Sequence, residues 1–304
     1  MTGTGTIAPM NQQALVLVSY GNRGVIELPD GTQTDCRYRR SVGRPYCGDR
    51  VMVEQSTGQP AMVTGIVTRA NEFARANARQ RKQVIAANLD QVLIVIAAAP
   101  EPSTDLVERY LVAIHSLGIE PVIVLNKCEL MAGREFAASS PLSHLDDYRG
   151  LGYELLATSC KGAPGIEAML PVLAGKTSIL VGQSGVGKSS MVNGLLPDLD
   201  LQTGALSRVT GKGTHTTTTT IMYKLSFGGR LIDSPGVWEY GLWEMDQSEL
   251  VSGFIDFHPY LGECKFNDCR HCGEPACAVA DAVNRGDIRK WRYHSYLRLL
   301  EQGG

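Results

Sequence analysis

One glycine-rich segment has the composition and spacing of a phosphate-binding loop. It fits GxxxxGK[ST] and directly follows an apolar strand predicted over residues 179–181. Such glycines let backbone N–H groups curl around a phosphate, while the lysine reaches the β- and γ-phosphates and the serine binds Mg²⁺. A glycine-rich turn without a ligand is the alternative. The predicted binding residues are Gly182, Gln183, Ser184, Gly185, Val186, Gly187, Lys188, Ser189 and, at the start of the following helix, Ser190.

A second motif indicates which base the nucleotide carries. Asn126-Lys127-Cys128-Glu129 follows a strand predicted over residues 121–125, as an NKxD motif does. A carboxylate at its fourth position accepts from the ring N–H and the exocyclic amine of guanine, and each such bond contributes roughly 1.5–3 kcal/mol. Glu129 is one methylene longer than the usual aspartate, so we expect guanine selectivity with an altered affinity. A helix N-terminus that carries Asn and Lys by chance is the alternative.

Two shorter motifs follow the ends of other predicted strands. Thr158-Ser159-Cys160-Lys161 is similar to the SAK loop that supports the base, so Ser159 is a predicted nucleotide contact. Asp233-Ser234-Pro235-Gly236 matches DxxG, in which the aspartate holds Mg²⁺ through water and the glycine N–H contacts the γ-phosphate.

A hydroxyl-rich segment over residues 211–220 lies between the phosphate loop and DxxG. We expect one of its threonines to bind Mg²⁺ and the γ-phosphate, and we favour Thr217 over Thr216. The remaining threonines, 218–220, fit an exposed β-edge.

Four of the eight cysteines lie within residues 264–277 beside His271, a spacing that indicates a metal site in a reducing compartment. The other four are scattered, as small buried hydrophobic residues are, and no role is assigned to them.

Composition sets the broad class of the protein. The 304 residues are 43% hydrophobic, enough for two or three domains, and their net charge is −2, which argues against a uniformly basic nucleic-acid binder. Neither a secretory leader nor a membrane-spanning run is present in the sequence, so we expect a soluble, cytoplasmic protein. Three local basic patches stand out: Arg37, Arg39, Arg40 and Arg44; Arg69, Arg75, Arg79, Arg81 and Lys82; and Arg285, Arg289, Lys290, Arg292 and Arg298.

The elements that must position these motifs differ along the chain. Residues 13–68 read as five short strands between turn signals, which predicts a small barrel compatible with an OB-fold and with RNA binding. The polar, basic stretch 69–88 is predicted to be a linker. Apolar strands then alternate with amphipathic helices, the first of them capped by Ser103 or Thr104, which predicts a parallel α/β sheet. After about residue 235 the pattern becomes helical, notably over residues 282–300.

The motifs occur in an unusual order, because the base-reading loop precedes the phosphate loop. With the barrel ahead of this circularly permuted α/β P-loop domain and the Cys/His cluster behind it, the chain resembles the ribosome small subunit-dependent GTPase A (RsgA) family along nearly its full length. The expected domains are an OB-fold RNA-binding barrel over 1–75, a permuted GTPase domain over 76–238 and a small helical zinc-binding domain over 239–304.

The resemblance also implies cofactors and partners. It implies one structural Zn²⁺ held by Cys264, Cys269, His271 and Cys277, with Cys272 as a competing thiol, and Mg²⁺ bound with GTP. It further implies a monomer that binds the small ribosomal subunit and its rRNA late in maturation and is stimulated by that subunit to hydrolyse GTP.

The expected catalytic residues are Lys188, Asp233 and His215. Lys188 and Mg²⁺ stabilise the charge that develops on the γ-phosphate. Val237 stands where many GTPases have a water-orienting glutamine, so we hypothesise that His215 orients the water; an exposed histidine without this role is the alternative. Two competing functions are an RNA-binding protein with a vestigial nucleotide pocket and an ATPase of another P-loop type.

Overall fold

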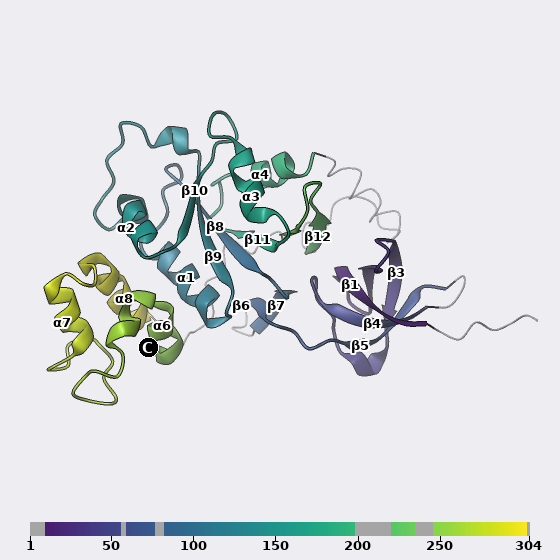
Figure 1. The fold of residues 1–304 in the computed structure, drawn as a ribbon, viewed down its shortest axis with the longest axis horizontal. Coiled ribbons are helices and arrows are strands. Elements are labelled where there is room, and N and C mark those ends of the chain that lie inside the picture. The colour runs from purple at the N-terminus through teal and green to yellow at the C-terminus, as the bar shows by residue number, and fades with distance from the viewer. Residues whose placement is uncertain (1–9, 56–58, 77–81, 198–219, 235–245, 303–304) are drawn as a thin grey trace, which may run out of the picture.

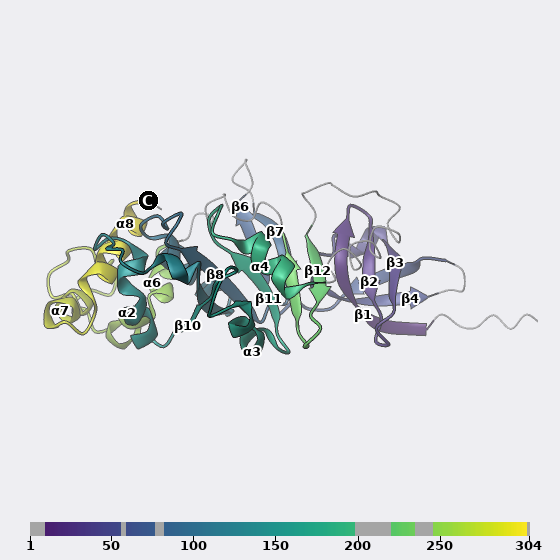
Figure 2. The same cartoon turned by 90° about the horizontal axis from the view of Figure 1, so that it is seen from above.

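The structure is a computed structural model that describes residues 10–55, 59–76, 82–197, 220–234 and 246–302. Figure 1 shows three parts along the long axis: a barrel, a central sheet with its helices, and a group of C-terminal helices. The view from above in Figure 2 shows the same succession, with the barrel and the C-terminal helices at opposite ends.

The predicted five-stranded barrel is confirmed. Its strand order is β1-β2-β3-β5-β4, and β4 returns to pair with β1, so the sheet closes in the order of an OB-like barrel. Buried and more exposed residues alternate along β4, where Val51 and Val53 are fully buried. The strands are β1 (Met10–Tyr20), β2 (Arg23–Glu27), β3 (Gln33–Tyr38), β4 (Arg50–Gln55) and β5 (Ala61–Ile66).

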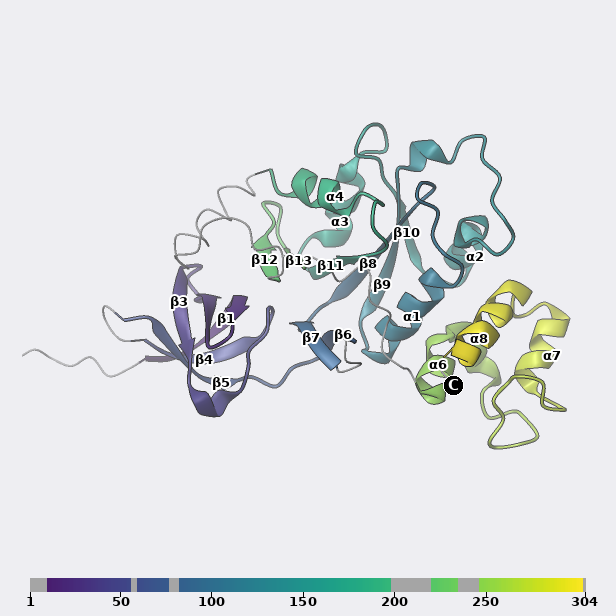
Figure 3. The same cartoon turned by 180° about the vertical axis from the view of Figure 1, so that it is seen from behind.

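The stretch predicted to be a linker is instead a β-hairpin, made of β6 (Glu72–Ala76) and β7 (Lys82–Ala87). Its basic residues suggest a solvent-exposed linker. Its short apolar residues Phe73, Ile85 and Ala86 are nevertheless buried in the core of the central sheet. The hairpin lies between the barrel and the central sheet (Figure 3).

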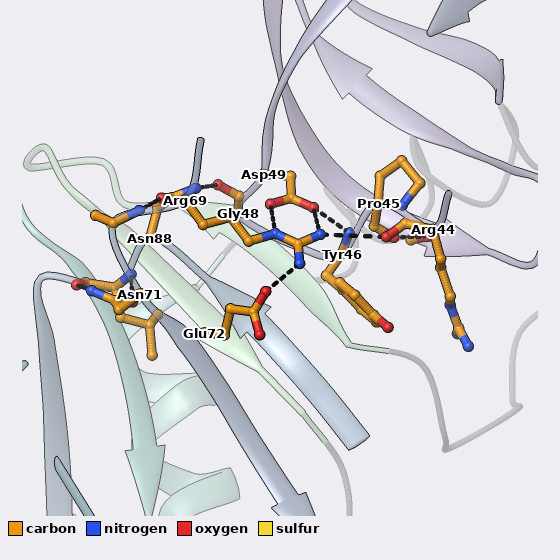
Figure 4. Close-up of polar contacts among 12 residues, drawn as sticks. Arg44, Pro45, Tyr46, Gly48, Asp49, Arg69, Asn71, Glu72 and Asn88 are labelled. Atoms are coloured by element: carbon orange, nitrogen blue, oxygen red, sulfur yellow. Dashed lines mark hydrogen bonds and ion pairs between the residues drawn. The ribbon is translucent and has the colours of Figure 1, made fainter. Parts of the chain in front are cut away.

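A partly buried ion pair fixes this hairpin to the barrel (Figure 4). The Arg69 guanidinium donates from Nε to Asp49 Oδ1 at 2.7 Å and from Nη2 to Asp49 Oδ2 at 2.8 Å, and its third nitrogen reaches Glu72 Oε1 at 2.6 Å. Asp49 is fully buried. Asn88 adds a second bridge, since its Nδ2 donates to Gly48 O at 2.9 Å. The barrel is therefore held by specific contacts rather than by a free tether.

The central sheet has the predicted α/β character. Its order is β10-β9-β8-β11-β13-β12, and all neighbours are parallel except the antiparallel pair β12–β13. Every residue of β8 is buried, as expected for a strand covered on both faces. The strands are β8 (Gln91–Ala97), β9 (Glu120–Asn126), β10 (Glu154–Ala157), β11 (Thr177–Val181), β12 (Ile221–Lys224) and β13 (Arg230–Asp233).

Among the described residues, the helices that accompany this sheet are α1 (Leu106–Ser116), α2 (Leu145–Gly150), α3 (Leu170–Leu173) and α4 (Lys188–Leu195). The predicted capping of the first helix by Ser103 or Thr104 is wrong, because the N-cap is Asp105. Asp105 has φ 67° and makes no side-chain capping bond. Its carboxylate accepts hydrogen bonds from Arg298 instead.

The predicted helical character of the C-terminal part is confirmed. The helices are α6 (Gln247–Gly253), α7 (Ala278–Arg285) and α8 (Lys290–Gln302), so the run predicted over 282–300 is two helices separated by Gly286, whose φ of 85° ends α7. Their common core includes Phe254, Phe257 and Tyr296, and it also takes in Val112 of α1.

The C-terminal helices pack closely against α1, as the view from behind in Figure 3 shows. Gly253 of α6 lies so near Val112 that an added Cβ would be 2.5 Å from its Cα. A buried Arg292 pairs with Asp256 at 2.8 Å and lies 3.6 Å from Glu108 of α1. Burial raises the pKa of Glu108, and the adjacent guanidinium opposes that shift.

Only the first of the three basic patches is exposed at all of its residues in the described part of the chain. In the second patch, Arg69 and Lys82 form ion pairs with acidic neighbours. In the third patch, Arg292 is buried and Arg298 is paired with Asp105. Arg69, Lys82, Arg292 and Arg298 are therefore engaged in internal contacts, while Arg285, Arg289 and Lys290 of the third patch are exposed.

None of the helices described here is long and apolar enough to cross a membrane.

Candidate nucleotide and metal sites

The parallel pairing of the central strands gathers the sequence motifs at one edge of the sheet. Residues 126–129, 158–161 and 182–189 stand at the ends of β9, β10 and β11, respectively, and Asp233 and Ser234 stand at the end of β13. Because the carboxyl ends of parallel strands lie at the same edge, motifs that are far apart in sequence become neighbours.

The glycines of the phosphate loop are required by the close packing of its backbone. Gly182 has φ 138°, and an added Cβ would lie 2.1 Å from Val95 O; Gly187 has φ 102°, and its Cβ would meet Asn126 Nδ2 at 2.3 Å. Lys188 is 7% exposed, and its Nζ donates to Gly182 O at 2.8 Å and Gln183 O at 2.6 Å. The ammonium group is thereby held inside the loop.

The base-reading motif is bonded directly to the phosphate loop. Asn126 is buried, and its Nδ2 donates to Val186 O at 2.8 Å. Lys127 Nζ donates to Gly185 O at 2.7 Å. The structure thus brings together the two motifs that the sequence separates by more than fifty residues.

The loop after β10 supports this arrangement from the other side. Thr158 Oγ1 donates to Asn126 Oδ1 at 3.2 Å, and its backbone N–H donates to Leu125 O. Ser159 is buried, and its Oγ accepts from Lys161 N at 3.0 Å. Glu129 is exposed on the short helical turn Cys128–Leu130.

Two of the predicted Mg²⁺ ligands, Ser189 and Asp233, follow from neighbouring strands of the sheet. Ser189 is exposed in the first turn of α4, while Asp233 ends β13, which pairs with β11. Burial raises the pKa of Asp233. Ser184, Gly185 and Ser190 are also exposed. The other predicted residues of this site, His215, Thr217 and Gly236, lie outside the described residues, as does Val237.

Residues 98–102, which follow β8 at the same sheet edge, belong to the site but were not predicted. Ala99 O accepts from Lys127 Nζ at 2.7 Å, and Glu101 O accepts from Gln183 Nε2 at 2.8 Å. Their position in the sequence could have indicated this, because the segment follows an apolar strand in the same way as the recognised motifs do.

The Cys/His cluster in the C-terminal helical part could hold a metal ion. One ligand atom from each of Cys264, Cys269, His271 and Cys277 lies within 4.8 Å of all the others. His271 Nδ1 is 3.5, 3.6 and 3.4 Å from the Sγ atoms of Cys264, Cys269 and Cys277, and the sulfurs of Cys264 and Cys277 are 4.0 Å apart.

Neighbouring groups fix this cluster in place. Tyr293 on α8 donates to His271 O at 2.9 Å, and Tyr296 donates to Arg270 O. Cys277 caps α7 through a bond from Ala280 N to its sulfur. Cys272, the competing thiol, is exposed and lies outside the group of four.

Comparison with known proteins decides the family. The model of the RsgA GTPase family matches residues 66–243, more than half of the chain. The chain belongs to the RsgA GTPase family.

Relatives in the RsgA family are similar over most of the chain. The small ribosomal subunit biogenesis GTPase RsgA of Serratia proteamaculans is 42% identical over 298 residues, which cover 95% of this chain and 84% of that relative. The protein of the same name from Chromohalobacter salexigens is 44% identical over 266 residues, with coverages of 88% and 77%.

Solved structures agree with the fold. The crystal structure of YjeQ from Thermotoga maritima has a TM-score of 0.77 at 29% identity and covers 97% of this chain and 99% of that one. YloQ, described as a circularly permuted GTPase, has a TM-score of 0.74 at 25% identity, with coverages of 100% and 98%. The resemblance to the RsgA family and the permuted order are therefore confirmed.

Proposed function

We propose that this protein is a GTPase that binds the small ribosomal subunit, acts in its late maturation and hydrolyses GTP to GDP and phosphate with stimulation by the subunit. The observation that carries the proposal is the direct bonding of a guanine-type motif to a phosphate loop, through Asn126 to Val186 O and Lys127 to Gly185 O. The names of the relatives supply the small subunit as the partner.

The base-reading side gives the nucleotide selectivity. Glu129 accepts from the two donors of guanine, while buried Asn126 and Ser159 and the stem of Lys127 position the ring. An adenine presents no such pair of donors, so ATP would leave the carboxylate without partners.

The phosphate side gives the chemistry. Lys188 is already aimed into the loop by its bonds to Gly182 O and Gln183 O, and a bound phosphate offers it stronger, charge-assisted acceptors. Backbone N–H groups of the loop and the N-terminus of α4 receive the phosphate oxygens. His215 orients the attacking water, and the Gly236 N–H contacts the γ-phosphate.

The oxygen groups of Ser189, Thr217 and, through water, Asp233 suit Mg²⁺, which prefers hard oxygen ligands. When bound, Mg²⁺ neutralises charge on the β- and γ-phosphates. The exposed hydroxyl of Ser189, in the first turn of the helix that follows β11, and the carboxyl of Asp233, at the end of the adjacent strand β13, fit this use.

The four-atom Cys/His cluster suits one structural Zn²⁺. A tetrahedral zinc with ordinary bond lengths places sulfur and nitrogen ligands about 3.5 Å apart and two sulfurs about 3.8 Å apart. The observed separations of 3.4–3.6 Å and 4.0 Å fit that geometry. Four protein ligands leave no open position, so the metal would supply folding energy rather than catalysis.

The barrel is proposed to contact rRNA through its exposed patch of Arg37, Arg39, Arg40 and Arg44. In this proposal the protein is a monomer with three domains: the barrel over 1–75, the GTPase domain over 76–238 and the zinc domain over 239–304.

A titration of the purified protein with GTP and with ATP tests the nucleotide part of the proposal. We expect GTP to bind far more tightly than ATP. Equal binding of the two would favour an ATPase of another P-loop type, and binding of RNA but of neither nucleotide would indicate an RNA-binding protein with a vestigial pocket.

A further inference from the structure

The segment of residues 98–105 joins β8 to α1 and contacts both halves of the candidate nucleotide site. Ala99 O holds the ammonium of Lys127 at 2.7 Å, and Glu101 O holds the amide of Gln183 at 2.8 Å. The ring of Pro100 lies 3.4 Å from where a Cβ on Gly185 would be. Any shift of this segment therefore moves acceptors away from the base-reading lysine and from the phosphate loop.

The far end of the same segment is held by the C-terminal helices. Asp105 is 3% exposed, and its carboxylate accepts from Arg298 Nε at 2.8 Å and from Arg298 Nη2 at 2.6 Å. Ser295 Oγ, one turn earlier on α8, also accepts from Arg298 Nη2 at 2.9 Å, which orients the guanidinium.

The local geometry shows that this carboxylate binds a side chain of α8 and does not cap α1. An aspartate at an N-cap ordinarily accepts from a backbone N–H in the first turn of its own helix, but Asp105 makes no such bond. It also adopts φ 67°, a conformation that costs energy for most residues and is best tolerated by Asn and Asp. Both features are explained if the backbone is turned so that the carboxylate meets Arg298.

We propose that Arg298 is a positioning residue for the nucleotide site, acting through Asp105 and the segment 98–105; this inference rests on the proposed guanine-nucleotide binding. While α8 is docked, Arg298 keeps the carbonyls of Ala99 and Glu101 in place, and GDP dissociates slowly. A partner that displaces α8 removes this support and accelerates nucleotide release.

The test is the dissociation rate of a fluorescent GDP from the full-length protein, chased with excess unlabelled GDP. Arg298→Gln and Asp105→Asn are measured against wild type, and Asn is chosen because it tolerates the positive φ. The matched control is Arg289→Gln. Arg289 also pairs across to the central part, with Asp147 of α2 at 3.1 Å, and not with the segment 98–105.

We expect Arg298→Gln and Asp105→Asn each to accelerate GDP release about fivefold or more. Fivefold is about the smallest effect that is typical of energetic coupling between two sites. The double variant should be no faster than the faster single variant, because both changes break the same contact. Arg298→Lys should restore part of the wild-type rate, and Arg289→Gln should release GDP at the wild-type rate.

Release at the wild-type rate from Arg298→Gln would overturn the inference and leave the proposed function intact. Equal acceleration in Arg289→Gln would also overturn it, since the effect would then be a general loosening of the interface. A wild-type protein that holds no GDP would overturn the proposed function together with this inference.

Discussion

At the scale of single residues, the candidate site is built from groups whose burial conflicts with their charge. Lys188 is buried yet cationic, and it is satisfied by two carbonyls of its own loop. Burial raises the pKa of the Asp233 carboxyl, because desolvation disfavours its charged form. A carboxyl perturbed in this way is common where a ligand completes a site.

The shift of Asp233 leads to a prediction about stability and activity. A carboxyl whose pKa is raised on folding destabilises the folded protein when ionised. This cost is present at neutral pH and disappears as the pH falls below the ordinary carboxyl range. Asp233→Asn should therefore raise the melting temperature of the nucleotide-free protein while lowering GTP hydrolysis about a hundredfold.

Calorimetry and a phosphate-release assay at neutral pH check both effects. Asp146→Asn, on the exposed surface of α2, is the control and should change neither. A lower melting temperature for Asp233→Asn would contradict this account of its burial.

At the scale of elements, close packing and buried ion pairs join the three parts of the chain. The helices α1 and α6 touch at Gly253, and the barrel meets the hairpin at Arg69. Each contact can be tested with a variant matched in chemistry but different in surroundings.

Gly253→Ala should destabilise the protein by about 1–3 kcal/mol, because its Cβ would lie 2.5 Å from Val112 Cα. The control is Gly150→Ala at the end of α2, where nothing lies within 4 Å of the added atom. That change should be neutral or stabilise by about 0.5 kcal/mol. Urea unfolding measures both, and equal effects at the two sites would show that α1 and α6 are not closely packed.

Arg69→Gln should cost about 3 kcal/mol of folding free energy, since it leaves the fully buried Asp49 without its guanidinium. Arg39→Gln removes the exposed pair with Glu54 and should cost less than about 1 kcal/mol. Guanidinium-chloride unfolding compares the two variants; a cost for Arg69→Gln as small as for Arg39→Gln would mean that Asp49 finds other partners.

At the scale of the whole molecule, the nucleotide site lies between two ends that both connect to it. The barrel end is joined through the Arg69 junction and through Arg230 of β13, which pairs with Glu27 of β2. The C-terminal end is joined through Arg292 and Arg298. A structural change caused by a ligand at either end can therefore reach the central sheet through these contacts.

The proposed zinc site stabilises one of these ends. Cys277→Ser should reduce the bound zinc from about one per chain to nearly none and unfold α7 and α8, because the metal would supply much of the folding energy of so small a unit. Cys272→Ser, outside the group of four, should keep the zinc. Metal analysis and far-UV circular dichroism check this, and zinc loss on replacing Cys272 would contradict the assigned ligand set.

Much of the site could be predicted from sequence, because its motifs are local. The phosphate loop, NKCE and the Cys/His cluster are each contiguous or nearly so, and glycine, charge and sulfur chemistry limit what those spacings can do. The barrel and the parallel sheet were also predictable from apolar periodicity. The ligand roles of the individual residues stay predictions.

Other features depended on tertiary contacts that no local spacing records. The linker prediction for the hairpin of β6 and β7 fails because its strands carry basic residues beside short buried runs, Phe73–Ala74 and Ile85–Ala87, which lack the alternation typical of a strand. The contacts of Ala99 and Glu101 use backbone carbonyls, which have no sequence signature. The predicted N-cap differs from the observed one because Asp105 is fixed by Arg298, which lies 193 residues away in the chain.

The most direct test is the rate of GTP hydrolysis by the purified protein with and without small ribosomal subunits, with ATP as the competing substrate. The account predicts slow GTP turnover that rises at least about tenfold with subunits, while ATP is hardly hydrolysed; tenfold corresponds to about 1.4 kcal/mol in the activation barrier. A GTP turnover that subunits do not change, or an equal turnover of ATP, would contradict it.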